Sequence, residues 1–125
     1  MTVRVYQPST LALLAEQHAA GSVEVTDEAV LPESDGEEDE YAALMTAADA
    51  STARQAGDGP GAGGRRVVVV VEVGEAPTIG DRVPWRRVVA VHADTEARPA
   101  DADPDDDLGW FATQEVPHLL ADAGT

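Results

Sequence analysis

Arg65-Arg66-Val67-Val68-Val69-Val70-Val71-Glu72-Val73 is the stretch of the chain that decides its fold. Its five consecutive valines are β-branched, which favours extended backbone, and the run leaves no polar face for water. A strand of this kind lies inside a sheet with other elements covering both of its faces. Trp85-Arg86-Arg87-Val88-Val89-Ala90-Val91-His92-Ala93 has the same character and predicts a second interior strand over 85–93.

The connection between these two strands sets their relative direction. Residues 74–84 number eleven, with two Gly and two Pro, and cannot form the helix that a parallel crossover needs. We therefore expect antiparallel neighbours, with Arg65 and Arg66 at one end of the sheet and Arg86 and Arg87 at the other, where each pair neutralises nearby carboxylates. A parallel pairing would instead gather the four guanidinium groups into an anion site.

The N-terminal part of the chain combines a strand with a capped helix. Val3–Tyr6 alternates apolar and polar residues and predicts a first strand that Pro8 ends. Ser9 or Thr10 then caps a helix that Gly21 terminates. The expected buried stripe of this helix is Leu11, Leu14, Ala15 and His18.

A second helix follows a short edge strand expected within residues 22–31. The spacing of Ser34–Glu37 is that of a capping box, which predicts where this helix starts. Its first turn holds only acidic residues, at 37–40, and Arg54 lies in its last turn, as the helix dipole favours. The expected buried stripe is Tyr41, Leu44, Met45 and Ala48.

Two loops interrupt the C-terminal half of the chain. Residues 56–64 contain five glycines and residues 94–107 contain seven acidic side chains, so we expect both loops to be flexible and solvated. Residues 108–112 predict a last strand. Thr113 or Glu115 then caps a short final helix.

Together these elements predict a single α/β domain over residues 1–125, α+β-like in arrangement and in the order βαβαββ(β)α. We expect a mixed sheet of about 4–5 strands with about three helices. The chain has no cysteine, which removes disulfides and thiolate chemistry, and it begins without a basic and apolar leader segment. No apolar run approaches the length of a membrane span. We therefore expect a cytoplasmic protein.

Charge is the other dominant feature of the chain. It carries 24 Asp and Glu against eight Arg and no Lys, a formal net charge of −16. Such a field repels nucleic acid and anionic membranes and favours a basic protein partner. The absence of lysine also follows from a high-GC coding sequence, and adaptation to high salt gives a similar acidic surface.

No motif in the chain specifies a catalytic, cofactor or metal site. The glycine-rich segment 56–64 lacks the Gly-Lys-Ser/Thr ending of a phosphate-binding loop and leads into a strand rather than a helix. Asp101–Asp107 resembles the start of a calcium loop, but Asp106 and Ala112 stand where that loop needs Gly and Glu. We therefore assign no catalytic residue, no metal and no cofactor.

Six polar and aromatic residues are the candidates for a ligand site, because we expect them at strand ends and at the turn into the last helix. They are Arg4, Tyr6, His92, Trp110, Gln114 and Glu115. The acidic loop that follows His92 predicts a raised pKa for its imidazole. A deep pocket that brings three or more of these residues together would favour a ligand site, and a flat surface would exclude one.

Four segments of the chain suggest a family. They are Arg4-Val5-Tyr6-x-Pro8-x-Thr10, Glu40-Tyr41-Ala42-Ala43-Leu44, Arg87-Val88-Val89-Ala90-Val91-His92 and Trp110-Phe111-Ala112-Thr113-Gln114-Glu115-Val116. Together they resemble an uncharacterised family of small acidic actinobacterial proteins, a domain of unknown function, and the resemblance covers nearly the whole chain. Members carry an aliphatic residue where Gln7 stands and often Tyr where Phe111 stands. The resemblance implies a cytoplasmic bacterial protein, with no activity and no residue roles.

The leading functional hypothesis is a non-enzymatic acidic interaction or accessory domain that binds a basic protein partner, as a monomer or small homo-oligomer. The alternative is a small enzyme or ligand-binding domain with a site near His92, Trp110, Gln114 and Glu115. A third interpretation, mimicry of nucleic acid by the acidic face, needs carboxylates spaced like phosphates. The sequence favours the first of the three.

Overall fold

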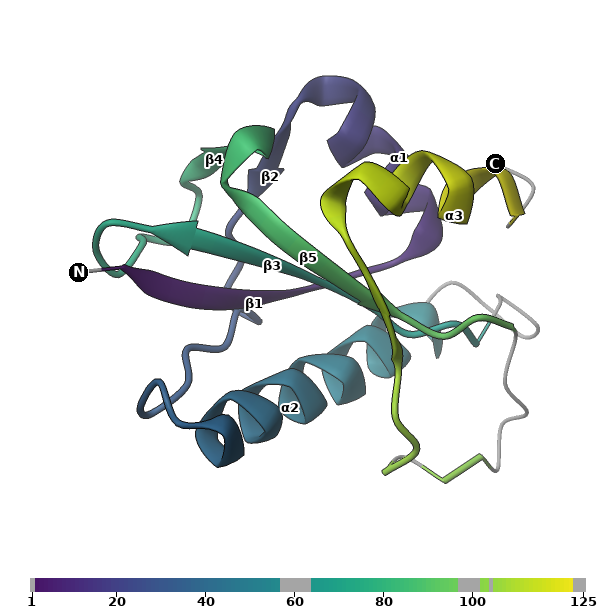
Figure 1. Ribbon diagram of the computed structural model, residues 1–125, viewed down its shortest axis with the longest axis horizontal. Helices are drawn as coiled ribbons and strands as arrows, with labels where there is room; N and C mark the ends of the chain where they lie inside the picture. The colour runs from purple at the N-terminus through teal and green to yellow at the C-terminus, as the bar shows by residue number, and fades with distance from the viewer. Residues whose placement is uncertain (1, 57–63, 97–101, 104, 123–125) are drawn as a thin grey trace.

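The computed structural model describes residues 2–56, 64–96, 102–103 and 105–122. Its main sheet has the strand order β1–β3–β5–β6, made of β1 (Val3–Ser9), β3 (Val67–Val73), β5 (Val88–Ala93) and β6 (Gly109–Phe111). A smaller sheet pairs β2 (Ser22–Glu24) with β4 (Arg82–Pro84). On one side of the main sheet lie α1 (Leu11–Ala20) and α3 (Val116–Asp122), and on the other lies α2 (Glu37–Ala56) (Figure 1).

β3 is the interior strand that the valine run predicts. β1 and β5 flank it, with Val67 opposite Ser9 on one side and opposite Ala93 on the other. The odd-numbered valines of 67–71 pack toward α1, α3 and the small sheet, and the even-numbered ones pack toward α2. All five are buried. Each removes an apolar side chain from water, worth about 1.5–3 kcal/mol, so this strand holds the layers together.

The predicted fold class and the antiparallel pairing of the two valine-rich strands are confirmed. Every strand pairing within the described residues is antiparallel, however, where the sequence predicted a mixed sheet. The second interior strand begins at Val88, because Trp85–Arg87 forms a 3₁₀ turn. Arg65 and Arg66 therefore lie at the opposite end of the sheet from Arg86 and Arg87, and the four guanidinium groups do not converge.

β1 runs on through Pro8 to Ser9, whereas the sequence predicted that Pro8 would end it. Tyr6 exchanges two backbone hydrogen bonds of 2.9 Å with Val30, at the outer edge of the sheet. Because alternate residues of a strand aim their N–H groups to the same side, the nitrogen of Pro8 also points to that outer edge. Its missing N–H removes no bond to β3, so the strand continues.

Helix α1 begins and ends where the sequence predicts. The hydroxyl of Thr10 accepts a hydrogen bond of 3.1 Å from the N–H three residues later, and Gly21 closes the helix with a left-handed φ of 75°. The predicted burial of His18 is wrong, because His18 is exposed and Gln17 is buried instead. The Ser9 hydroxyl donates a hydrogen bond to the amide oxygen of Gln17, which draws that side chain toward the sheet.

Helix α2 has the predicted acidic first turn and the predicted Arg54 in its last turn. Its buried residues include three alanines, Ala43, Ala47 and Ala48, whose small side chains let the helix approach the sheet closely. Of the predicted buried stripe, Leu44 and Ala48 are buried, but its first residue was predicted wrongly. Tyr41 is 49% exposed rather than buried.

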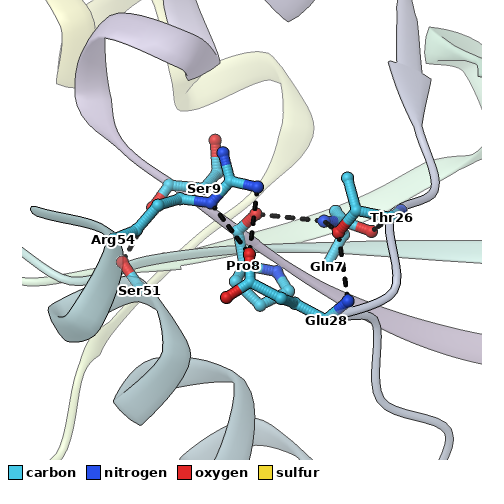
Figure 2. Close-up of polar contacts among 7 residues, drawn as sticks. All are labelled: Gln7, Pro8, Ser9, Thr26, Glu28, Ser51 and Arg54. Atoms are coloured by element: carbon cyan, nitrogen blue, oxygen red, sulfur yellow. Dashed lines mark hydrogen bonds and ion pairs between the residues drawn. The ribbon is translucent and has the colours of Figure 1, made fainter. Parts of the chain in front are cut away.

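Hydrogen bonds at the C-terminal end of β1 join three parts of the chain (Figure 2). The buried amide of Gln7 donates to the hydroxyl of Thr26 at 2.8 Å and accepts from the N–H of the same residue at 3.0 Å. Ser51 of α2 donates to the carbonyl oxygen of Ser9 at 2.7 Å and accepts from the N–H of Val67 at 2.9 Å. These bonds fix α2 across the ends of β1 and β3.

A buried ion pair lies at the same end of the main sheet, where β3 begins and β5 ends. Arg66 and Asp94 have side chains 1% and 7% exposed, and their closest nitrogen and oxygen atoms lie 2.8 Å apart. Asp94 also accepts from the backbone N–H of Arg66 at 2.8 Å. The sequence placed Asp94 in the solvated loop 94–107, and that prediction is wrong at this residue. Of the predicted flexible loops 56–64 and 94–107, residues 57–63, 97–101 and 104 lie outside the described residues.

No helix among the described residues has both the length and the apolar character needed to span a membrane.

Replacing Asp94 tests how far this ion pair stabilises the fold. Asp94→Ala removes the carboxylate that pairs with the buried guanidinium of Arg66, so we expect a loss of about 3–5 kcal/mol in the free energy of unfolding. Glu24→Ala is the control, because Glu24 forms an exposed pair with Arg82 at 3.6 Å and should cost at most about 1 kcal/mol. Urea unfolding followed by circular dichroism measures both, and equal losses would contradict the assignment.

Candidate functional site

One face of the main sheet is only partly covered. Helix α2 packs on β1 and β3, and a helix about 10 Å wide covers roughly two strands spaced about 4.8 Å apart. The same face continues past the helix onto β5 and β6, where His92 pairs with Trp110. The uncovered half of the face and the side of α2 therefore form the two walls of a groove.

The groove has a volume of about 840 Å³. Its residues come from the four strands of the main sheet and from the first turns of α2. They are Arg4, Tyr6, Glu37, Glu38, Glu40, Tyr41, Leu44, Val70, Val89, Ala90, His92 and Trp110. We call this hollow the α2–β6 groove.

Four of the six residues predicted as a ligand site, Arg4, Tyr6, His92 and Trp110, line the α2–β6 groove. The other two do not. Gln114 and Glu115 lie in the 3₁₀ turn Thr113–Glu115 after β6, where the carboxylate of Glu115 accepts a hydrogen bond of 2.9 Å from the N–H of Ala112. Glu115 therefore caps the last helical segment, and Thr113, the other predicted cap, instead donates to a carbonyl oxygen of β5.

The groove gathers exposed apolar side chains. Trp110 is 61% exposed, Tyr41 49% and Val89 38%, and they are three of the five large hydrophobic residues exposed on the described surface. Val89 is in the groove because of a bulge, since Val70 of β3 faces Ala90 and the next residue of β3 faces Val88. Exposed aromatic and aliphatic side chains in a concave site are typical of a binding surface.

One end of the groove holds a hydrogen-bonded cluster. Arg4 contacts Glu40 at 2.9 Å and Glu72 at 3.2 Å, and the hydroxyl of Tyr6 donates to the same oxygen of Glu40 at 3.1 Å. Burial, followed by the charge of Glu40, raises the pKa of Tyr6 to about 12. The hydrogen bond to Glu72 is the main factor that raises the pKa of Arg4. At neutral pH this end therefore presents a cation and a protonated phenol.

His92 lies on the floor of the groove and is half-buried. Burial lowers the pKa of its imidazole below the ordinary 6.5, whereas the sequence predicted a raised pKa from the acidic loop. Loss of hydration is the cause of this shift. In the part of the chain that the structure describes, the ring has no hydrogen-bond partner, so a neutral imidazole is free to bind a ligand.

Carboxylates form the helical wall of the groove. Glu37 and Glu38 are exposed and form no ion pair within the described residues. Tyr41, one turn later, donates a hydrogen bond of 3.0 Å to Asp107, which is the main factor that raises the pKa of its hydroxyl. The groove therefore combines an aromatic surface with an excess of negative charge.

The sequence prediction missed this helical wall. Glu37, Glu38 and Tyr41 stand at i, i+1 and i+4, so one side of the helix carries all three. That spacing was the available signal, but the acidic turn was explained by the helix dipole and Tyr41 was assigned to the core.

The groove contains side chains of the kinds that transfer protons or bind metals, namely His92, Tyr6 and the carboxylates of α2. Tyr6 is protonated at neutral pH, and the groove pairs no hydroxyl or carboxylate with His92 among the residues described. No group of three or more His, Asp or Glu side chains within the described ranges is arranged to hold a metal ion. The predicted calcium-like segment extends over Asp101 and Pro104, which lie outside those ranges.

Comparison with known protein families gives a match over most of the chain. The model of a family of unknown function, DUF6912, matches residues 3–120. Searches of curated proteins and of solved structures found no match.

The raised pKa of Tyr6 predicts a loss of stability at alkaline pH. Between the ordinary tyrosine pKa of 10.0 and the value of about 12 in the fold, the folded chain keeps a proton that the unfolded chain releases. This contribution is complete below pH 10 and is lost as the pH rises through about 12. Tyr6→Phe should remove that part of the pH dependence, measured by urea unfolding at stepped alkaline pH.

Both chains in this comparison should carry Tyr41→Phe, because the pKa of Tyr41 is also raised. If stability declines equally with and without the Tyr6 hydroxyl, the protonated phenol does not contribute.

Proposed function

We propose that this chain, which belongs to the DUF6912 family of unknown function, is a non-enzymatic interaction domain that binds a basic protein partner through the α2–β6 groove. The observation that carries the proposal is the combination in one hollow of exposed Trp110 and Tyr41 with the carboxylates of Glu37 and Glu38, which form no ion pair with any described residue.

Electrostatics support a basic partner. A net charge of −16 on 125 residues attracts cations from a distance and repels polyanions, so association with a basic surface is fast and weakens with salt. Aromatic side chains then supply the contact energy, since Trp and Tyr are enriched among the residues that dominate protein interfaces. The same groove supplies both the acidic and the aromatic side chains.

A small-molecule site in the same groove is the second candidate. It is favoured by the volume of about 840 Å³, which falls within the usual range of ligand pockets, roughly 300–1,000 Å³. The neutral imidazole of His92 and the indole N–H of Trp110 would orient such a ligand. The excess of carboxylates favours a cationic ligand in this case as well.

We also propose that the protein works in the cytoplasm of an actinobacterium, because the family resemblance suggests it and the lysine-free composition fits a high-GC coding sequence. Its oligomeric state, monomer or small homo-oligomer, stays a prediction.

Removing two carboxylates from the groove tests the proposal. We expect Glu37→Gln with Glu38→Gln to weaken binding of a fluorescent Arg- and Lys-rich peptide several-fold more than Glu16→Gln with Glu75→Gln, two exposed carboxylates outside the groove. Fluorescence anisotropy measures both. Binding should also weaken as the screening length falls from about 30 Å at 0.01 M salt to about 10 Å at 0.1 M.

The matched pair separates a site from a diffuse field, because both double variants change the net charge by the same amount. Equal weakening would mean that only net charge matters, and no binding of the basic peptide at low salt would contradict the proposal. Circular dichroism checks that α2 keeps its helix, since its first-turn carboxylates also interact with the helix dipole.

A further inference from the structure

Within the proposed interaction, the α2–β6 groove contains features that select one kind of cation. Trp110 presents a large, exposed aromatic surface, and Glu37 and Glu38 offer charge that no cation in the described part of the chain neutralises. His92 adds a neutral imidazole with no hydrogen-bond partner among the described residues. We infer that the groove binds the guanidinium group of an arginine side chain from the partner, in preference to the ammonium group of lysine.

The planar geometry of the guanidinium group fits these surroundings. It stacks on aromatic rings, it is more weakly hydrated than an ammonium group, and it donates hydrogen bonds in a fork that matches carboxylates. An ammonium group is compact and strongly hydrated, so it loses more hydration free energy than a guanidinium group when it moves from water onto an aromatic surface. A groove with both an aromatic surface and carboxylates therefore discriminates between the two cations.

Arg4 provides an internal example of the same chemistry. Its guanidinium lies at one end of the groove and contacts carboxylates from two elements, Glu40 of α2 at 2.9 Å and Glu72 of β3 at 3.2 Å. The wall of α2 thus already binds one guanidinium through its third acidic lining residue. Glu37 and Glu38, three and two residues earlier in the helix, also line the groove and are placed to bind another.

The aliphatic floor suits the rest of the arginine side chain. Val89 and Ala90 are aliphatic residues that β5 contributes to the lining, where the methylene groups of an arginine bury apolar area while its head group stays hydrated. Because Val89 is brought there by the β-bulge, the bulge contributes directly to the binding surface.

Three short peptides, identical except for one central residue, test the inference. The central residue is arginine, lysine or citrulline, and citrulline keeps the shape of arginine without its charge. We expect the arginine peptide to bind several-fold more tightly than the lysine peptide, and the citrulline peptide to bind least. Isothermal titration calorimetry at low salt measures the three affinities.

The two tryptophans of the chain provide an internal control by NMR. Trp110 lines the groove, whereas Trp85 packs against the core on the opposite face of the sheet, so only the indole N–H signal of Trp110 should shift on titration. Trp110→Ala should remove the preference for arginine over lysine. Ile79→Ala, which changes an apolar residue 67% exposed outside the groove, should leave it intact.

The outcomes separate this inference from the proposed function. Equal affinity for the arginine and lysine peptides, or a preference that survives Trp110→Ala, would overturn guanidinium selection and leave binding of a basic partner standing. Failure of both peptides to bind would overturn the proposed function itself. Binding of agmatine, a free guanidinium compound, as tight as that of the arginine peptide would overturn the assignment to a protein side chain.

Discussion

The burial of β3 on both faces is the constraint on which the remaining structure depends. A run of five valines has no side that tolerates water, so a layer of other residues must cover each face of the strand. Helices α1 and α3 and the small sheet cover one face, and α2 covers the other. The neighbouring strands β1 and β5 satisfy its backbone hydrogen bonds.

The position of α2 follows from this constraint and in turn creates the groove. At its C-terminal end Ser51 binds backbone groups of both β1 and β3, and near its start Glu40 contacts Arg4 and Tyr6 of β1. A helix held at both ends over these two strands cannot also cover β5 and β6. The acidic first turn of α2 and the aromatic side chain of Trp110 therefore face the same open space.

The sequence was sufficient where local chemistry decides the structure. The valine run predicted β3, and Thr10 and Gly21 marked the ends of α1, because strand propensity, capping and left-handed backbone act within a few residues. The prediction failed where a residue's structure depends on partners that are distant in the sequence. Pro8 continues a strand because its nitrogen faces an outer edge, and Asp94 is buried because it pairs with Arg66 of the neighbouring strand segment. Neither partner can be identified from spacing along the chain.

The candidate site shows the same division. Strand-end reasoning selected Arg4, Tyr6, His92 and Trp110, which the register of the sheet brings to one face. It missed the groove residues on α2, because the side of that helix that faces the sheet is set by three alanines packed against the strands. The most direct test of this account is chemical-shift mapping of the isotope-labelled protein with an arginine-containing basic peptide. The account predicts shifts concentrated in β5, β6 and the first turns of α2, and shifts concentrated on α1 and α3 would contradict it.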